Sequence, residues 1–87
     1  MIRIPERDNA VNSGPIRNAR DLGAWIRQRR TSIGLTQAGL ADVAGVGVRF
    51  ISELERGKPT AEVGKVLHVA GVLGLDLHIG VRPGGNA

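Results

Sequence analysis

The spacing of apolar residues between Arg20 and Gly74 predicts four helices. Apolar side chains recur there at steps of three and four residues, which places them on one face of a helix. The predicted helices cover about 20–33, 37–44, 47–55 and 61–73. Thr36 and Thr60 are suited to cap the second and fourth helices, and stop signals follow the first, second and fourth helices at Gly34, Gly45 and Gly74.

Two of these helices carry a stripe of residues that we expect to face the core. On the first helix the stripe comprises Leu22, Trp25, Ile26, Arg29 and Ile33. Because arginine is charged, we expect the stem of Arg29 to lie along the core while its head reaches outward. On the fourth helix the stripe comprises Val63, Val66, Leu67, Ala70 and Leu73.

The apolar period changes from helical to alternating after Gly74. The residues at every second position from there are Leu75, Leu77, Ile79 and Val81, a pattern typical of a half-buried strand. A single strand is not stable alone, so it needs a partner. The stretch 1–4 is one candidate, but the same strand of a second subunit is simpler. The sequence therefore predicts that residues 75–82 form a dimerisation strand across a homodimer.

The rest of the chain divides around this helical segment. Residues 1–17 lack periodicity and contain two prolines, so we expect a flexible N-terminal arm, followed by one helical domain at 18–74. Residues 83–87 are predicted to be a disordered tail. A chain of 87 residues makes one domain and buries only about 60% of its unfolded surface, which favours dimerisation.

The net charge of +4 is concentrated in the first two-thirds of the chain. Residues 1–58 hold ten Arg/Lys and six Asp/Glu, whereas residues 59–87 hold two of each. This arginine-rich excess indicates a polyanionic partner, although ordinary solubilising charge remains the alternative. The absence of cysteine, of a membrane-spanning apolar run and of a signal-peptide core leads us to expect a cytoplasmic protein with no membrane partner.

Residues 37–56 have the small and apolar residues that two short, steeply crossing helices need. Ala41 provides the close approach, and Gly45 provides a turn residue that tolerates positive φ. The side chains expected to face inward are Leu40, Ala44, Val46, Ile51 and Leu54. This combination predicts a helix-turn-helix at 37–56.

At this point the chain resembles a known family. The matching residues are Leu22-Gly23, Ile26-Arg27, Arg30, Gly34-Leu35-Thr36-Gln37, Leu40-Ala41, Ile51-Ser52 and Leu54 through Lys58. Over about 20–74 the chain is similar to helix-turn-helix domains of the lambda-repressor/Cro (XRE) type. Residues 50–60, 64–67 and 73–77 further resemble HipB-type antitoxins. The expected fold class is mainly α, a four- to five-helix lambda-repressor-like domain with a C-terminal β-strand.

The resemblance implies roles for individual residues. The third helix would read DNA through its outward positions, and the implied DNA-binding residues are Gln37, Gly47, Val48, Arg49, Ser52, Arg56 and Lys58. Arg49 is suited to guanine and Val48 to a thymine methyl group. Lys58 matches a phosphate contact, while Arg56 is either a phosphate clamp or solvent-facing charge. Arg30 and Glu55 match a structural ion pair.

The function implied is that of a sequence-specific transcriptional repressor that binds double-stranded operator DNA as a homodimer. The HipB likeness implies a toxin–antitoxin pair, in which the chain represses its own operon and neutralises a HipA-like serine/threonine kinase toxin. The alternatives are a stand-alone XRE-family regulator and a protein-interaction adaptor that does not bind DNA.

Other chemistry is not expected from the remaining residues. Neither His68 nor His78 has a second ligand at metal-binding spacing, and Ser52 has no histidine near it, so we expect no metal site, cofactor or enzymatic activity. Phe50 could line the DNA surface, but core packing is the favoured interpretation. Trp25 is expected in packing or in a dimer contact. The arm carries Arg3, Arg7 and Arg17, which either reach DNA or are solvated charge.

Overall fold

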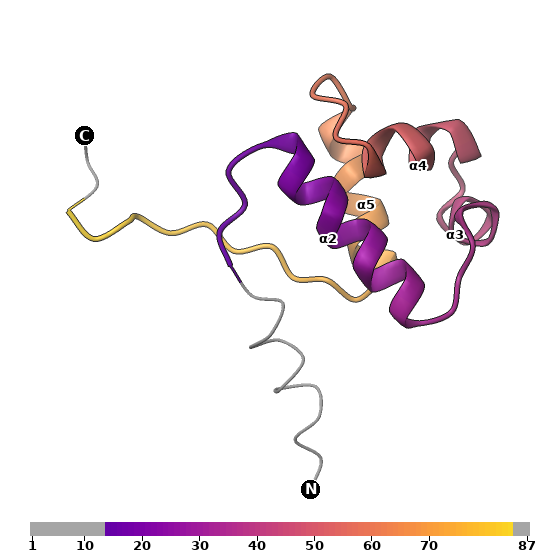
Figure 1. Cartoon of the computed structure of the whole chain (residues 1–87), viewed down its shortest axis with the longest axis horizontal. Helices are drawn as coiled ribbons and strands as arrows, with labels where there is room; N and C mark the ends of the chain where they lie inside the picture. The colour runs from indigo at the N-terminus through magenta and orange to yellow at the C-terminus, as the bar shows by residue number, and fades with distance from the viewer. Residues whose placement is uncertain (1–13, 85–87) are drawn as a thin grey trace, which may run out of the picture.

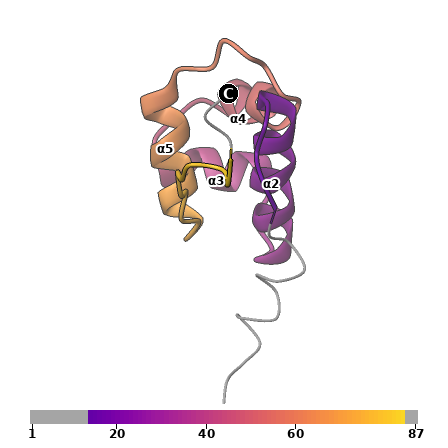
Figure 2. The same ribbon diagram turned by 90° about the vertical axis from the view of Figure 1, so that its left-hand side faces the viewer.

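The computed structural model describes residues 14–84, and four α-helices lie in this range. They are α2 (Ala19–Ser32), α3 (Gln37–Ala44), α4 (Val48–Glu55) and α5 (Val63–Val72). Helix α4 packs against α2 and α3, and α3 also packs against α5 (Figure 1). The view in Figure 2 shows α2 and α5 on opposite sides of this arrangement. The mainly helical fold that the sequence predicts is confirmed.

The helix starts depend on side-chain caps in two of the four helices. The Asn18 side chain accepts a hydrogen bond from the Asp21 amide at 2.8 Å at the start of α2. The predicted cap of α3 is confirmed, because Thr36 Oγ1 accepts from the Gly39 amide at 2.9 Å. The predicted cap of α5 at Thr60 is wrong. Residues 59 and 60 form a turn, and the backbone is still extended at residue 62 (φ −67°, ψ 117°), so α5 begins after it.

The core is a single apolar cluster to which all four helices contribute. Its buried members are Ile26, Leu40, Ala41, Ala44, Ile51, Leu54, Val66, Val69, Ala70 and Leu73. The inward-facing positions predicted for α3 and α4 are therefore confirmed, with Val46 partly buried beside them. Burying a large aliphatic side chain contributes about 1.5–3 kcal/mol, so this cluster fixes the orientation of α4 on the domain.

The predicted core face of α5 is partly wrong. Val63 and Leu67 are exposed, whereas Val69, absent from the predicted stripe, is fully buried. The buried face of α5 follows the i, i+3, i+4, i+7 spacing from Val66 to Leu73, and Leu67 lies on the flank of that face.

The α2 stripe also differs from prediction at its C-terminal end. Arg29 and Ile33 are exposed, and Arg30 is the arginine that reaches the interior. Arg30 can be buried because a carboxylate of α4 accompanies it. The Arg29 side chain instead donates from Nε to the Leu73 carbonyl at 2.8 Å, which satisfies an acceptor at the end of α5.

Residues 75–82 have no regular secondary structure, and the described range contains no β-strand. Leu75 packs against the core, and its amide donates to the Ala70 carbonyl at 2.9 Å. Beyond it Leu77, Ile79 and Val81 are exposed, and the segment runs away from the helices in Figure 1. The alternative partner at residues 1–4 lies outside the described residues.

The two chain ends are only partly covered by the structure. Residues 14–17 have no regular secondary structure and are exposed, while the rest of the predicted arm, with Arg3 and Arg7, lies outside the described residues. The described part of the predicted tail, 83–84, is an exposed turn, and 85–87 also lie outside. None of the described helices has the length and apolar character needed to cross a membrane.

Candidate nucleic-acid interface

The connection between α3 and α4 is a tight turn that depends on one glycine. Gly45 has φ 72° and ψ 32°, a left-handed conformation that side-chain-bearing residues rarely adopt. The Val46 amide then donates to the Ala41 carbonyl at 3.0 Å, and Ala41 itself is buried in the core. Gly45 and Ala41 therefore have the roles in this turn that the sequence predicted for them.

The N-terminal part of α4 projects from the domain. Gly47, Val48 and Arg49 are exposed there, and the Arg49 side chain retains 89% of its accessible surface. A Cβ atom added at Gly47 would meet no described atom within 4 Å, so the start of α4 is open. No side chain of the described residues caps this helix start, so the first amides of α4 have no side-chain acceptor. Ser52 lies one turn further and is partly buried.

Phe50 faces the domain rather than the open side of α4. Its ring is partly buried against the core, and Lys65 Nζ lies 5.8 Å from the ring centroid. The interpretation of Phe50 as a packing residue is confirmed. Trp25 is also partly buried.

Glu53 links two of the predicted DNA-binding side chains. Its Oε2 accepts from Arg49 Nε at 3.1 Å, and its Oε1 accepts from Lys58 Nζ at 3.0 Å. The hydrogen bond from Lys58, followed by that from Arg49, lowers the pKa of Glu53 below its usual value. Glu53 is thus a residue of the site that the sequence analysis missed, although the i,i+4 spacing from Arg49 was a visible signal.

The chain after α4 continues this charged surface. Arg56 and Lys58 are exposed, and together with Glu53 and Pro59 they line an open hollow of about 350 Å³. The structure therefore brings Arg56 and Lys58 to the same end of α4, beside the carboxylate that also holds Arg49.

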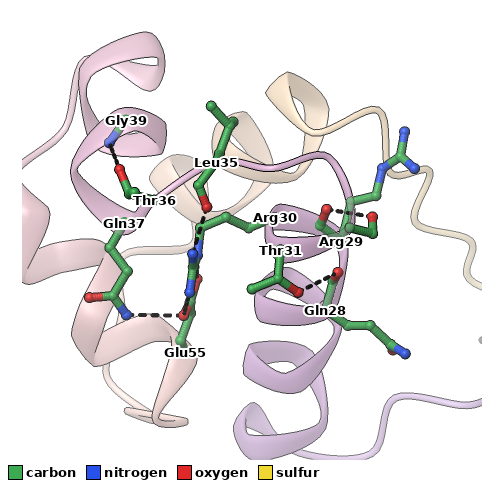
Figure 3. A network of polar contacts seen from close by, with 10 residues as sticks. Gln28, Arg29, Arg30, Thr31, Leu35, Thr36, Gln37, Gly39 and Glu55 are labelled. Carbon is green, nitrogen blue, oxygen red and sulfur yellow. Dashed lines mark hydrogen bonds and ion pairs between the residues drawn. The ribbon is translucent and has the colours of Figure 1, made fainter.

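A buried polar network fixes the C-terminal end of α4 (Figure 3). Arg30 donates from Nε and Nη2 to the two oxygens of Glu55 at 2.6 and 3.0 Å, and from Nη1 to the Leu35 carbonyl at 2.7 Å. Gln37 Nε2 adds a hydrogen bond to Glu55 Oε1 at 3.0 Å. The network ties α2 and the start of α3 to α4, and it accounts for one donor of the Gln37 amide.

The ionised forms of both partners are favoured in this network. The hydrogen bond to Glu55 raises the pKa of Arg30. Burial would raise the pKa of Glu55, but the hydrogen bonds from Arg30 and Gln37 outweigh it. The pKa of Glu55 therefore lies below its ordinary value of 4.5.

The histidines and acidic residues of the described part do not assemble a metal site. No group of three or more His, Cys, Asp or Glu side chains with metal-binding geometry occurs within residues 14–84. His68 Nε2 lies 3.0 Å from the Ala44 carbonyl, which gives this histidine a structural contact between α5 and α3.

Comparison with known proteins places the turn and both flanking helices in one family. Residues 26–79 match the helix-turn-helix family. The chain belongs to the XRE-type helix-turn-helix family. The uncharacterized HTH-type transcriptional regulator y4mF of Sinorhizobium fredii (strain NBRC 101917 / NGR234) is 51% identical over 69 residues, which are 79% of this chain and 90% of the relative.

A solved chain of HipB, from a complex with an O2 20mer, has the same helix-turn-helix fold. The two chains superpose with a TM-score of 0.70 and are 23% identical. The matched region covers 76% of this chain and 92% of the HipB chain. This likeness shows the fold of the domain.

The lowered pKa of Glu55 predicts that this helix-turn-helix domain loses stability in acid. A carboxylate with a folded-state pKa below its unfolded value stabilises the fold above the unfolded pKa, and that contribution disappears as the pH falls through the folded pKa. We expect the melting temperature to fall between neutral pH and about pH 3. Thermal unfolding followed by circular dichroism checks this, and a variant with leucine at both Arg30 and Glu55, which has neither the carboxylate nor an unpaired arginine, should show a shallower decline. An equal pH dependence in both proteins would contradict the assignment.

Proposed function

We propose that this chain is a sequence-specific DNA-binding transcriptional repressor that inserts α4 into the major groove. The observation that carries the proposal is the exposed N-terminal half of α4, held on a rigid core and presenting Arg49 outward. An α-helix fits the major groove of B-DNA, where each base pair shows a distinct pattern of donors and acceptors. The 51% identical relative is an HTH-type transcriptional regulator, which supports the same class of function.

Within this proposal the outward residues of α4 read bases. Arg49 would donate to O6 and N7 of a guanine, the commonest specific contact in the major groove. Val48 would meet a thymine methyl group, Gly47 would allow a close approach of the backbone, and Ser52 would contact a base or a phosphate. Binding by this helix would repress transcription by occluding the promoter.

The residues around α4 would hold the DNA backbone. Arg56 and Lys58 lie at the end of the helix, where both side chains can reach phosphates. Gln37 would contact the backbone from the start of α3 through the part of its amide that Glu55 does not engage. These contacts carry no sequence information, but they set the register of Arg49 on the bases.

Salt-dependent binding tests the proposed function. The probe is the DNA immediately upstream of the chain's own coding sequence, measured by fluorescence anisotropy over a range of salt concentrations. If Arg56 and Lys58 of two subunits neutralise phosphates, the logarithm of the affinity should fall with the logarithm of salt with a slope of about −3 to −4. The absence of binding in dilute buffer would overturn the proposal and favour an adaptor that binds protein.

Arg49→Ala is expected to relax sequence preference at one base pair of each half-site. A bidentate arginine–guanine pair contributes about 1–3 kcal/mol of discrimination, and the exposed side chain has no role in the core. Competition with single-base-pair variants of the bound DNA measures this loss. Lys58→Ala is the matched comparison, because it should weaken all sequences alike and reduce the salt slope. A uniform effect of Arg49→Ala on every variant would contradict the assignment.

We further propose a homodimer joined through residues 75–82. This segment leaves the helices in Figure 1 and presents Leu77, Ile79 and Val81 to solvent, and its alternating pattern suits an antiparallel ribbon with the same segment of a second subunit. Two-fold symmetry would then place two α4 helices about 34–36 Å apart, one turn of DNA. Leu75, Leu77, Ile79 and Val81 would form the apolar face of the ribbon.

Ile79→Asp is expected to convert the dimer to a monomer and to weaken operator binding. Ile79 is 100% exposed in the single chain, so the substitution leaves the helical core intact while placing a charge on the ribbon. Sedimentation equilibrium measures the change. The matched control is Val63→Asp, which likewise places a negative charge at an exposed apolar residue, here on α5, and should leave the dimer intact. A stable Ile79→Asp dimer would exclude this interface.

The finer proposal is that the repressor is the antitoxin of a HipBA-like type II pair and sequesters a HipA-like serine/threonine kinase toxin. Its support is the resemblance of residues 50–60, 64–67 and 73–77 to HipB-type antitoxins, together with the shared fold. A kinase that co-purifies with the chain from its own host would support this role. A host without such a kinase beside the gene would leave the stand-alone regulator as the function.

A further inference from the structure

We propose that Glu53 determines operator specificity by positioning Arg49. In the proposed DNA complex, on which this inference rests, the Glu53 carboxylate holds the Arg49 guanidinium so that only its terminal N–H groups are presented to a base. Glu53 would act through Arg49 and would not touch DNA itself.

The geometry shows how one carboxylate orients two cations. Glu53 Oε2 accepts from Arg49 Nε at 3.1 Å, while Oε1 accepts from Lys58 Nζ at 3.0 Å. The Glu53 side chain retains only 22% of its accessible surface, against 89% for Arg49. The partly buried Glu53 carboxylate thus holds Nε of Arg49, while the Arg49 side chain as a whole stays exposed.

The nitrogen that Glu53 engages determines which edge of the guanidinium remains available to a base. Arginine has five N–H donors, and it can meet a guanine either through Nε and one terminal nitrogen or through both terminal nitrogens. Because Nε is occupied by Glu53, the pair formed by Nη1 and Nη2 is left for O6 and N7. Glu53 also accepts from Lys58, so one carboxylate holds both the side chain proposed to contact a phosphate and the side chain proposed to contact a base.

Two separable effects follow for binding. An arginine that is already oriented loses less rotamer freedom when it meets its base, and that saving corresponds to about 2- to 12-fold in affinity for the cognate base pair. The negative charge of Glu53 also disfavours DNA of every sequence by repelling phosphates. The first effect concerns one base pair, and the second is independent of sequence.

Glu53→Ala separates these effects when binding is measured on the upstream DNA and on each of its single-base-pair variants. We expect discrimination at the base pair read by Arg49 to fall about 2- to 12-fold, with discrimination at the other positions unchanged. Affinity for unrelated DNA should rise. The matched control is Glu62→Ala, which removes a carboxylate that pairs with Lys65 at 3.6 Å at the exposed start of α5 and should leave the base preferences as they are.

The same substitution in an Arg49→Ala background decides whether Glu53 acts through Arg49. There, Glu53→Ala should change no base preference, because the side chain that it positions is absent. Unchanged discrimination in the single variant would overturn the inference. A change of equal size in both backgrounds would also overturn it, since it would mean that Glu53 reads a base directly. Failure of the proposed function looks different, because the unsubstituted protein itself would then not bind.

Discussion

Replacing Glu55 by alanine is expected to lower the free energy of unfolding by about 3–5 kcal/mol. The substitution leaves the Arg30 guanidinium, whose side chain retains only 10% of its accessible surface, without its counter-charge in the interior. Gln37 loses its acceptor at the same time. Because natural domains are stabilised by only about 5–15 kcal/mol, this loss is a large fraction of the total stability. Urea denaturation followed by circular dichroism measures the loss.

Two companion variants make the result interpretable. Glu62→Ala removes an exposed carboxylate paired with Lys65 and should cost at most about 1 kcal/mol. Replacing Arg30 and Glu55 together by leucine should recover part of the loss, since no isolated charge remains in the interior. Recovery should be incomplete because the Leu35 carbonyl and the Gln37 amide would lack partners. A Glu55→Ala protein as stable as the Glu62→Ala protein would contradict a structural role for the pair.

Gly23→Ala is expected to destabilise the domain although alanine is the better helix former. Helix α2 crosses α4 so closely at this point that a Cβ atom would lie 2.3 Å from the Leu54 carbonyl oxygen and 2.9 Å from that of Glu55. Backbone atoms cannot rotate away, so α2 and α4 would have to separate. Such overpacking costs typically about 1–3 kcal/mol, which lowers the melting temperature by several degrees.

Gly71→Ala is the matched control for this prediction. Gly71 is also helical, but a Cβ atom added there meets no described atom within 4 Å. Alanine should therefore leave stability unchanged or raise it by up to about 1 kcal/mol through helix propensity. Differential scanning calorimetry of both variants checks the contrast. Equal melting temperatures would mean that the α2–α4 contact yields more easily than the structure implies.

Some features determined by local chemistry were predictable from the sequence, although the cap expected at Thr60 was wrong. The Thr36 cap and the left-handed turn at Gly45 each depend on a few neighbouring residues, and both occur where the sequence placed them. The helix bounds of α3 agree for the same reason. The inward positions of α3 and α4 followed because a helix has a fixed period of 3.6 residues.

Features that depend on which elements meet in space were predicted less well. The sequence placed Arg29 at the core, but the carboxylate that makes burial possible lies on another helix and faces Arg30. Gly23 carried no signal of its close approach to α4, because that contact joins segments more than 30 residues apart. Val69 was missed on α5 because helical spacing alone left the direction of the core open.

The candidate site also contains some residues that the sequence predicted and one that only the structure revealed. The outward positions of α4 were accessible to sequence reasoning, since the helix face opposite the core residues must point away from the domain. The role of Glu53 required coordinates, because Lys58 reaches it from beyond the helix end. The ribbon at 75–82 stays a prediction, since it concerns a second copy of the chain.

The central claim, that α4 enters the major groove, is tested most directly by dimethyl sulfate protection of the bound upstream DNA. This reagent methylates guanine N7, an atom that faces the major groove. We predict protected guanines in two tracts about one helical turn apart, with one guanine in each tract becoming reactive again in Arg49→Ala. Full reactivity at every guanine of saturated DNA would contradict the account.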